Sequence, residues 1–127
     1  GIAEEVPAHS GTGLYALSKA AGQEICRIFS ENHPIHILCL LFLNFKPPQP
    51  DPGAEGLDLN SFSVTFRDAG EAARLALEVD LATLPSRNEI FFITTDLPHG
   101  KYSNAKARRL LGFDPQDKLE KYWRKKR

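Results

Sequence analysis

The chain has 127 residues, 16 basic and 16 acidic side chains, a formal net charge of zero and an apolar content of 42%. This composition is ordinary for a single soluble domain with a modest core, and it excludes a charge-rich disordered chain. No apolar run is long enough to span a membrane and no secretory signal is visible, so we expect a cytoplasmic protein without a membrane partner.

The first predicted element is an amphipathic helix over residues 14–31. Its apolar positions recur at intervals of three and four residues: Leu14, Leu17, Ala21, Ile25 and Ile28. Pro34 ends the pattern, and the run Ile35–Leu43 that follows is apolar on both faces, as in a buried parallel strand. A helix, a short turn and a buried strand make half of a βαβ unit, which predicts an α/β fold.

Tyr15 and Lys19 stand four positions apart at the start of this helix. One helical turn separates them, so the phenol and the ammonium share a face. A nearby ammonium lowers the pKa of a tyrosine from its ordinary value of about 10, and such a phenol can exchange a proton with a carbinol near neutral pH. The pair favours hydride transfer to a nicotinamide. The same spacing also occurs where a core tyrosine lies beside a solvated lysine.

A loop rich in proline and glycine follows between Lys46 and Leu59. We interpret it as a stiff active-site loop, although Pro47–Pro50 also fits a Pro-x-x-Pro ligand. Ser63–Phe66 is a short strand candidate. A helix is then predicted to start at Asp68, with Glu71 completing a capping box. Its inward stripe is expected to consist of Ala69, Ala72, Ala73, Ala76 and Leu77.

The C-terminal third contains one more buried strand and two helices. Glu89–Thr94 is the strand candidate. Ser103 is predicted to cap a helix through Leu111, with Gly112 as the stop. Asp117 and Glu120 can cap a final short helix, whose apolar side is Leu119, Tyr122 and Trp123.

The remaining reactive residues predict no further site. Cys26 and Cys39 are expected to be small buried core residues. The four histidines show no metal spacing, so we predict no metal site. The basic residues Lys121 and 124–127 form a charged tail that can bind nucleic acid, but more often such a tail is a solvated helix end, and we expect no nucleic-acid partner.

Four segments together resemble the extended short-chain dehydrogenase/reductase family, the NAD-dependent epimerases and dehydratases. The resemblance covers residues 10–117 and places a Tyr-Gly-x-Ser-Lys helix at Tyr15–Lys19 and a Leu-Arg-x-x-Asn strand end at Leu40–Asn44. It continues with an Arg-Asp-x-Ala helix start at Arg67 and a Lys-Ala-x-x-x-Leu-Gly signature at Lys106–Gly112. The last two segments look closest to the uronate dehydrogenase-like branch.

The resemblance implies NAD(P)-dependent oxidation, reduction or epimerisation of a sugar or sugar nucleotide. Tyr15 would be the acid/base, and Tyr15 and Lys19 would contact the cofactor, with Lys19 bonding the nicotinamide ribose. Asn44 would contact substrate. Arg67 would touch substrate, or would form a structural ion pair with Asp68 or Glu71.

The family's Gly-x-x-Gly-x-x-Gly turn and the strand with its catalytic Ser or Thr have no counterpart in these residues. We therefore expect residues 1–127 to form one partial domain, the C-terminal portion of a Rossmann-like parallel sheet with flanking helices. Truncation, proteolysis and gene splitting would each produce such a chain. NAD or NADP would serve the parent enzyme, and we expect this chain alone to be inactive and to bind either dinucleotide weakly or not at all.

A second hypothesis is a non-catalytic assembly module. The family's strand arginine is Leu41 here, which alters the substrate pocket. In the family, the helix that carries Tyr15 and Lys19 commonly packs in a dimer. Without a neighbour, one edge of the strand 35–43 would also be unpaired. We expect a homo-oligomer with residues 35–43 or the helix 14–31 at its interface.

Overall fold

The computed structural model describes residues 1–5, 10–48 and 59–123. Helix α1 (Leu14–Asn32) leads into strand β1 (Ile37–Leu41) and the short strand β2 (Asn44–Lys46). Strand β3 (Ser63–Thr65) runs directly into helix α2 (Phe66–Glu78), and β4 (Asn88–Phe92) precedes helix α3 (Ala105–Leu111). Two 3₁₀ turns, Leu81–Thr83 and Glu120–Tyr122, complete the described elements.

The strands form two parallel pairs. β1 pairs with β4 in a register that joins Ile37 to Asn88 and Leu41 to Phe92. β2 pairs with β3, joining Asn44 to Ser63 and Lys46 to Thr65. The fold is thus α/β with parallel strands flanked by helices, a partial Rossmann-like arrangement, as the sequence predicts. The β2–β3 ladder was not predicted.

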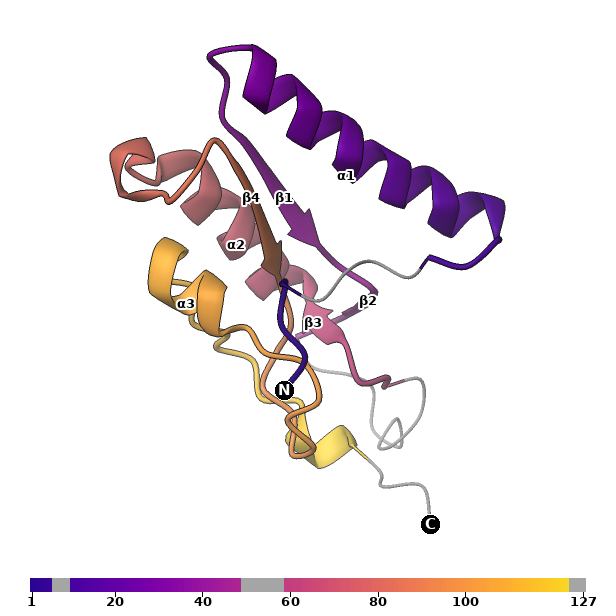
Figure 1. The fold of residues 1–127 in the computed structure, drawn as a ribbon. Coiled ribbons are helices and arrows are strands. Elements are labelled where there is room, and N and C mark those ends of the chain that lie inside the picture. Colours follow the sequence, from indigo (N-terminus) through magenta and orange to yellow (C-terminus); the bar gives the residue numbers. More distant parts are fainter. Residues whose placement is uncertain (6–9, 49–58, 124–127) are drawn as a thin grey trace.

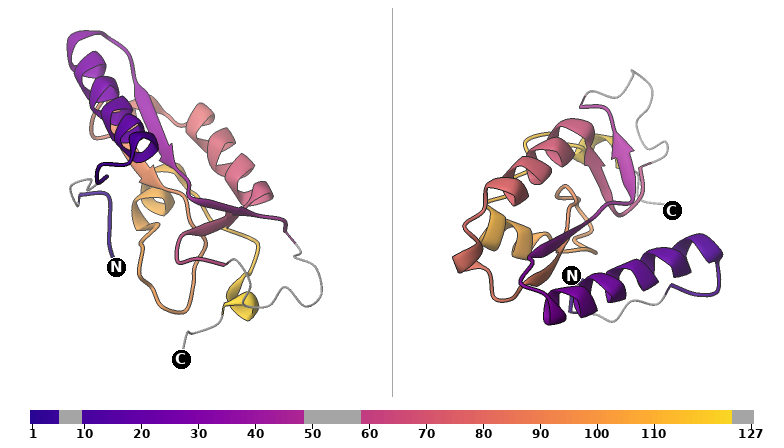
Figure 2. Two further views of the ribbon diagram at one scale, coloured as in Figure 1. Left: turned by 90° about the vertical axis from the view of Figure 1, so that its right-hand side faces the viewer. Right: turned by 90° about the horizontal axis from the view of Figure 1, so that it is seen from above.

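The helices cover the β1–β4 pair from both sides (Figures 1 and 2). α1 lies along one face, whereas α2 and α3 lie on the other. The main core fills the second interface, around Phe91, Ile93 and Phe113, which expose 0%, 0% and 1% of their surface. Leu38 and Leu40 of β1 pack against this core. The core therefore belongs to the α2–α3 side of the sheet.

The long elements confirm the predicted ones, with shifted ends. α1 extends one residue beyond the predicted 14–31, whereas β1 is shorter than Ile35–Leu43. β1 is half-buried along its length, so the expectation of a strand buried on both faces was wrong. Cys26 and Cys39 are likewise half-buried rather than core residues. Within the described residues, β4 is the only strand that pairs with β1.

The cap of α2 differs from the prediction. Thr65 is the N-cap, and its Oγ1 accepts a hydrogen bond from the Asp68 amide at 3.2 Å. Asp68 lies in the first turn, where its buried carboxylate accepts the amides of Gln116 and Asp117, each at 3.0 Å. Glu71 pairs with Arg74 instead of completing a capping box. A carboxylate needed by a distant segment is unavailable for a local cap.

The inward stripe of α2 is narrower than predicted. Ala69 and Ala72 are buried, but Ala73 is exposed and Leu77 exposes 88% of its surface. Leu75 and Val79 pack against the core in their place. The stripe therefore follows the side of the helix that α3 and the sheet cover.

The C-terminal elements begin later than predicted. α3 starts at Ala105 with Asn104 as N-cap, although the Ser103 Oγ does accept the Ala105 amide at 3.2 Å. Gly112 ends α3 in the left-handed conformation at φ 72°, as predicted. The final helix is a 3₁₀ turn with buried Leu119 and Tyr122. Asp117 does not cap it, because its carboxylate binds Thr65 and Arg67.

Candidate functional site

The N-terminal end of α1 lies toward the carboxyl ends of the parallel strands. The other end of α1 is fixed beside the strands' amino ends, where the Arg87 Nη2 donates to the Glu31 carbonyl at 3.4 Å. At the same place the Ile37 amide donates to the Arg87 carbonyl at 2.7 Å. Since α1 and β1 run in opposite directions (Figure 1), the first turn of α1 points to the end of the sheet where α/β proteins bind ligands.

Tyr15 and Lys19 lie side by side on this turn. The Lys19 Nζ is 5.5 Å from the centroid of the Tyr15 ring, as one helical turn of separation predicts. Tyr15 exposes 77% of its surface, and Lys19 is also exposed. The phenol is thus accessible to a reactant and has a positive charge beside it.

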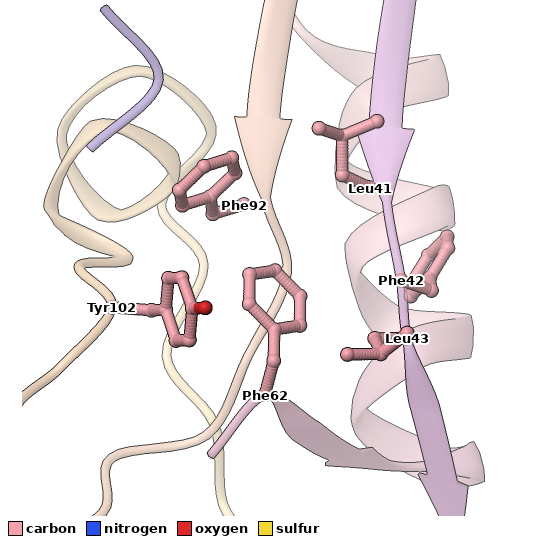
Figure 3. A pocket seen from close by; sticks show the side chains of 6 residues that line it. All are labelled: Leu41, Phe42, Leu43, Phe62, Phe92 and Tyr102. Carbon is pink, nitrogen blue, oxygen red and sulfur yellow. The ribbon is translucent and has the colours of Figure 1, made fainter. Parts of the chain in front are cut away.

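An apolar cavity of about 180 Å³ opens at the carboxyl ends of β1 and β4 (Figure 3). It is lined by Leu41, Phe42, Leu43, Phe62, Phe92 and Tyr102. Phe62 makes edge-to-face contacts with both Phe92 and Tyr102, with ring centroids 5.3 and 5.2 Å apart. Leu41, which stands where the resembled family has an arginine, contributes an apolar wall. This cavity was not predicted, because Phe62 and Tyr102 come from loops with no regular spacing.

Asn44 and Arg67 do not meet in the structure. Asn44 begins β2, is half-buried and lies opposite Ser63, one residue beyond the cavity residue Leu43. Arg67 follows the other end of the same ladder, beyond Thr65. The ladder places these two predicted substrate residues at opposite ends, and Asn44 follows the cavity residue Leu43 in the chain without lining the cavity itself.

Arg67 forms an ion pair with Asp117, fifty positions away. The predicted ion-pair partners, Asp68 and Glu71, were therefore wrong. The carboxylate of Asp117 is buried and also accepts the Thr65 hydroxyl at 2.5 Å. Burial alone would raise the pKa of Asp117, but the hydrogen bonds from Arg67 and Thr65 outweigh it and hold this pKa below its ordinary value.

The part of the chain that the structure describes holds no group of three or more His, Cys, Asp or Glu side chains arranged for a metal. Its helices include none that is long and apolar enough to cross a membrane. The histidine His9, the loop residues 49–58 and the basic residues 124–127 lie outside the described residues.

The chain is 30% identical over 106 residues to an NAD-dependent glucose-6-phosphate dehydrogenase of Haloferax volcanii. The alignment takes in 84% of this chain but 38% of that enzyme, so the chain spans little more than a third of its relative's length. No family model matches the chain, and no solved structure matches it. The chain is therefore similar to part of an NAD-dependent dehydrogenase.

Proposed function

We propose that this chain provides the proton-transfer helix of an NAD(P)-dependent oxidoreductase that acts on a sugar. The observation that carries the proposal is the contact between Tyr15 and Lys19, on the turn of α1 that points to the carboxyl end of the sheet. The similarity to a glucose-6-phosphate dehydrogenase supports a sugar, or a sugar phosphate, as the substrate.

Each residue has a separate role in this proposal. The Tyr15 phenolate accepts the hydroxyl proton of the sugar carbinol as the carbon–hydrogen bond breaks. A bound NAD(P) would supply the hydride acceptor for that carbon. Lys19 would donate to the ribose hydroxyls of the cofactor, and its ammonium group lies beside the Tyr15 ring. The donors present thus fit the ribose end of a dinucleotide.

Asn44 and Arg67 are the proposed substrate contacts. Asn44 begins β2, next in the chain to the cavity residue Leu43, and its amide would hold a sugar hydroxyl. Asp117 engages the Nε and Nη2 of Arg67, so the Nη1 is the donor that a substrate would use. The two residues would therefore contact different parts of a substrate.

The pyrophosphate of the cofactor needs a further binding element. No glycine-rich phosphate turn is present in these 127 residues, and Tyr15 and Lys19 supply contacts at the ribose end alone. We therefore propose that this chain by itself binds NAD or NADP weakly and is inactive. Calorimetric titration of the chain with each dinucleotide should give no dissociation constant at or below the micromolar range.

The catalytic proposal is tested on the protein expressed with its complete reading frame. The assay follows NADH or NADPH formation with glucose 6-phosphate, glucose and a uronate as separate substrates. We expect turnover of at least one of them, with a preference for one dinucleotide. Absence of turnover with every substrate, although the protein binds NAD, would contradict an oxidoreductase acting on these sugars.

A second candidate function is assembly, and the exposed face of α1 favours it. Five apolar side chains of this helix expose about half of their surface or more: Leu14, Leu17, Ile25, Ile28 and Phe29. A surface of this kind marks a protein interface when its residues lie together. A homo-oligomer through α1 would cover this surface, and one through β1 would pair the edge of β1 that no strand among the described residues pairs.

Light scattering at tens of micromolar tests the assembly function. We expect a dimer or a larger oligomer. Ile25→Lys should shift it toward monomer, because it puts a charge on the exposed face of α1 that association would bury. Lys19→Ala is the matched control, because it changes a charged residue of the same helix and none of the five apolar side chains. It should leave the oligomer intact. A wild-type chain that stays monomeric would reject this candidate.

A further inference from the structure

The side of α1 that faces the sheet is marked by a short stripe of protected residues. Gln23 and Cys26 are half-buried and Ser30 is buried, at spacings of three and four residues. Their neighbours Ile25 and Phe29 are exposed by more than half. Because residues at these spacings share one face of a helix, Cys26 lies on the face that packs against the sheet.

The alternation along β1 identifies which of its side chains face α1. Leu38 and Leu40 pack against the core on the α2–α3 side. Successive side chains of a strand point to opposite faces, so Cys39, between these two leucines, points toward α1. α1 and β1 lie side by side in both views (Figures 1 and 2).

The two cysteines lie at this interface, and their thiol groups interact. Burial raises the pKa of the Cys39 thiol, and so do the charge interaction and the side-chain hydrogen bond with Cys26. Both cysteines are free and half-buried, so the pair is partly accessible from solvent. The burial stripe, the strand alternation and the thiol contact thus agree on one pair of neighbouring sulfurs.

We propose that Cys26 and Cys39 form a dithiol site that exchanges with a small-molecule disulfide, such as oxidised glutathione, to give an intramolecular disulfide between α1 and β1. The site lies outside the proposed catalytic residues: Cys26 is eleven positions beyond Tyr15 along α1. The proposal therefore does not depend on the proposed function.

The exchange proceeds in two balanced steps. The Cys26 thiolate attacks one sulfur of oxidised glutathione, which breaks the glutathione S–S bond, forms a mixed disulfide and releases one glutathione. Cys39 then loses its proton and attacks the Cys26 sulfur, which releases the second glutathione. One disulfide is consumed and one is formed, so no further oxidant is needed.

The new bond would fix the least buried helix to the sheet. Cys26 and Cys39 are thirteen positions apart, so the bond closes a short loop through the α1–β1 turn. We expect the oxidised chain to melt several degrees higher than the reduced chain. The bond would also restrict sliding of α1 on β1, and with it the position of the turn that carries Tyr15 and Lys19.

Intact-mass spectrometry of the full chain tests the site. After incubation with oxidised glutathione, we expect the wild-type mass to fall by two hydrogen atoms, and peptide mapping should join residue 26 to residue 39. Cys26→Ser and Cys39→Ser should each retain one glutathione instead, because neither variant has a second thiol to release it. The same exchange on the chain unfolded in urea is the control, because it shows how much the fold contributes to pairing the two thiols.

Three results would overturn the proposal. A wild-type chain that keeps glutathione adducts has thiols that cannot reach each other. Thiols that remain unreacted, while the same chain reacts fully in urea, are inaccessible in the folded protein. A disulfide between two copies of the chain would show that the sulfurs meet across an interface between molecules.

Discussion

The two faces of the β1–β4 pair are built differently. The face toward α2 and α3 is closed by a core around Phe91, Ile93 and Phe113, and by buried carboxylates that hold the C-terminal segment in place. The face toward α1 has one buried helix residue, Ser30, and several exposed apolar side chains. One half of the fold is therefore stabilised by its own contacts, whereas the helix with Tyr15 and Lys19 keeps several apolar side chains exposed.

The largest expected difference in stability between the two faces comes from replacing one isoleucine on each face with alanine. Ile93→Ala removes a fully buried side chain and should lower the free energy of unfolding by about 2–5 kcal/mol. Ile25→Ala removes a side chain that is 58% exposed, and the change should be within about 0.5 kcal/mol. Urea denaturation of both variants measures the contrast.

If Ile93→Ala does not fold, Ile93→Val gives a milder form of the same test, with an expected loss of about 0.5–1.5 kcal/mol. Equal losses at the two sites would mean that the α1 face is already covered in solution.

The buried carboxylates should give the next largest effect. Asp68→Ala leaves the amides of Gln116 and Asp117 without their acceptor, and each unsatisfied buried group costs about 1–3 kcal/mol. Glu71→Ala, three positions along the same helix, removes an exposed partner of Arg74 and should change stability little. The melting temperature of Asp68→Ala should be clearly lower than that of Glu71→Ala. Similar melting temperatures would contradict the role of Asp68 in holding the amides of Gln116 and Asp117.

The features that the sequence could predict are those that depend on local patterns. α1 follows from apolar periodicity, and β1 and β4 follow from short apolar runs, all of which are local properties. Gly112 ends α3 because it can adopt a positive φ. The pairing of Tyr15 with Lys19 follows from helical spacing for the same reason.

Features that depend on distant partners could not be read from spacing. Asp68 looked like a cap because the residues that occupy its carboxylate are 48 and 49 positions away. Arg67 was given neighbouring partners, but Asp117 binds it across the fold. β2, at three residues, is too short to show an alternating pattern, and the pairing of the predicted strand at Ser63 with β2 could not be read from spacing either.

A smaller effect on stability is expected when the pH is lowered. The pKa of Asp117 is lower in the folded chain than its ordinary value of about 3.9, so its stabilising contribution is complete above that value. The contribution is lost as the pH falls through the folded pKa. Asp117→Asn should therefore lose less stability than the wild type between about pH 4 and pH 2.

Denaturation curves at several pH values check this dependence, with Glu78→Gln on exposed α2 as the control. Parallel losses in Asp117→Asn and in the wild type would show that Asp117 does not carry the acid response.

The central claim concerns the first turn of α1, where Tyr15 is proposed to accept the substrate proton. The most direct test is the turnover number of Tyr15→Phe in the protein expressed with its complete reading frame. Tyr102→Phe, which alters the other tyrosine near the strand ends, is the matched control. Loss of a general base should lower turnover of Tyr15→Phe by about a hundredfold to ten-thousandfold while the fold is retained. Activity of Tyr15→Phe within about threefold of the wild type would contradict the assignment, since this is far below the effect of general acid–base catalysis.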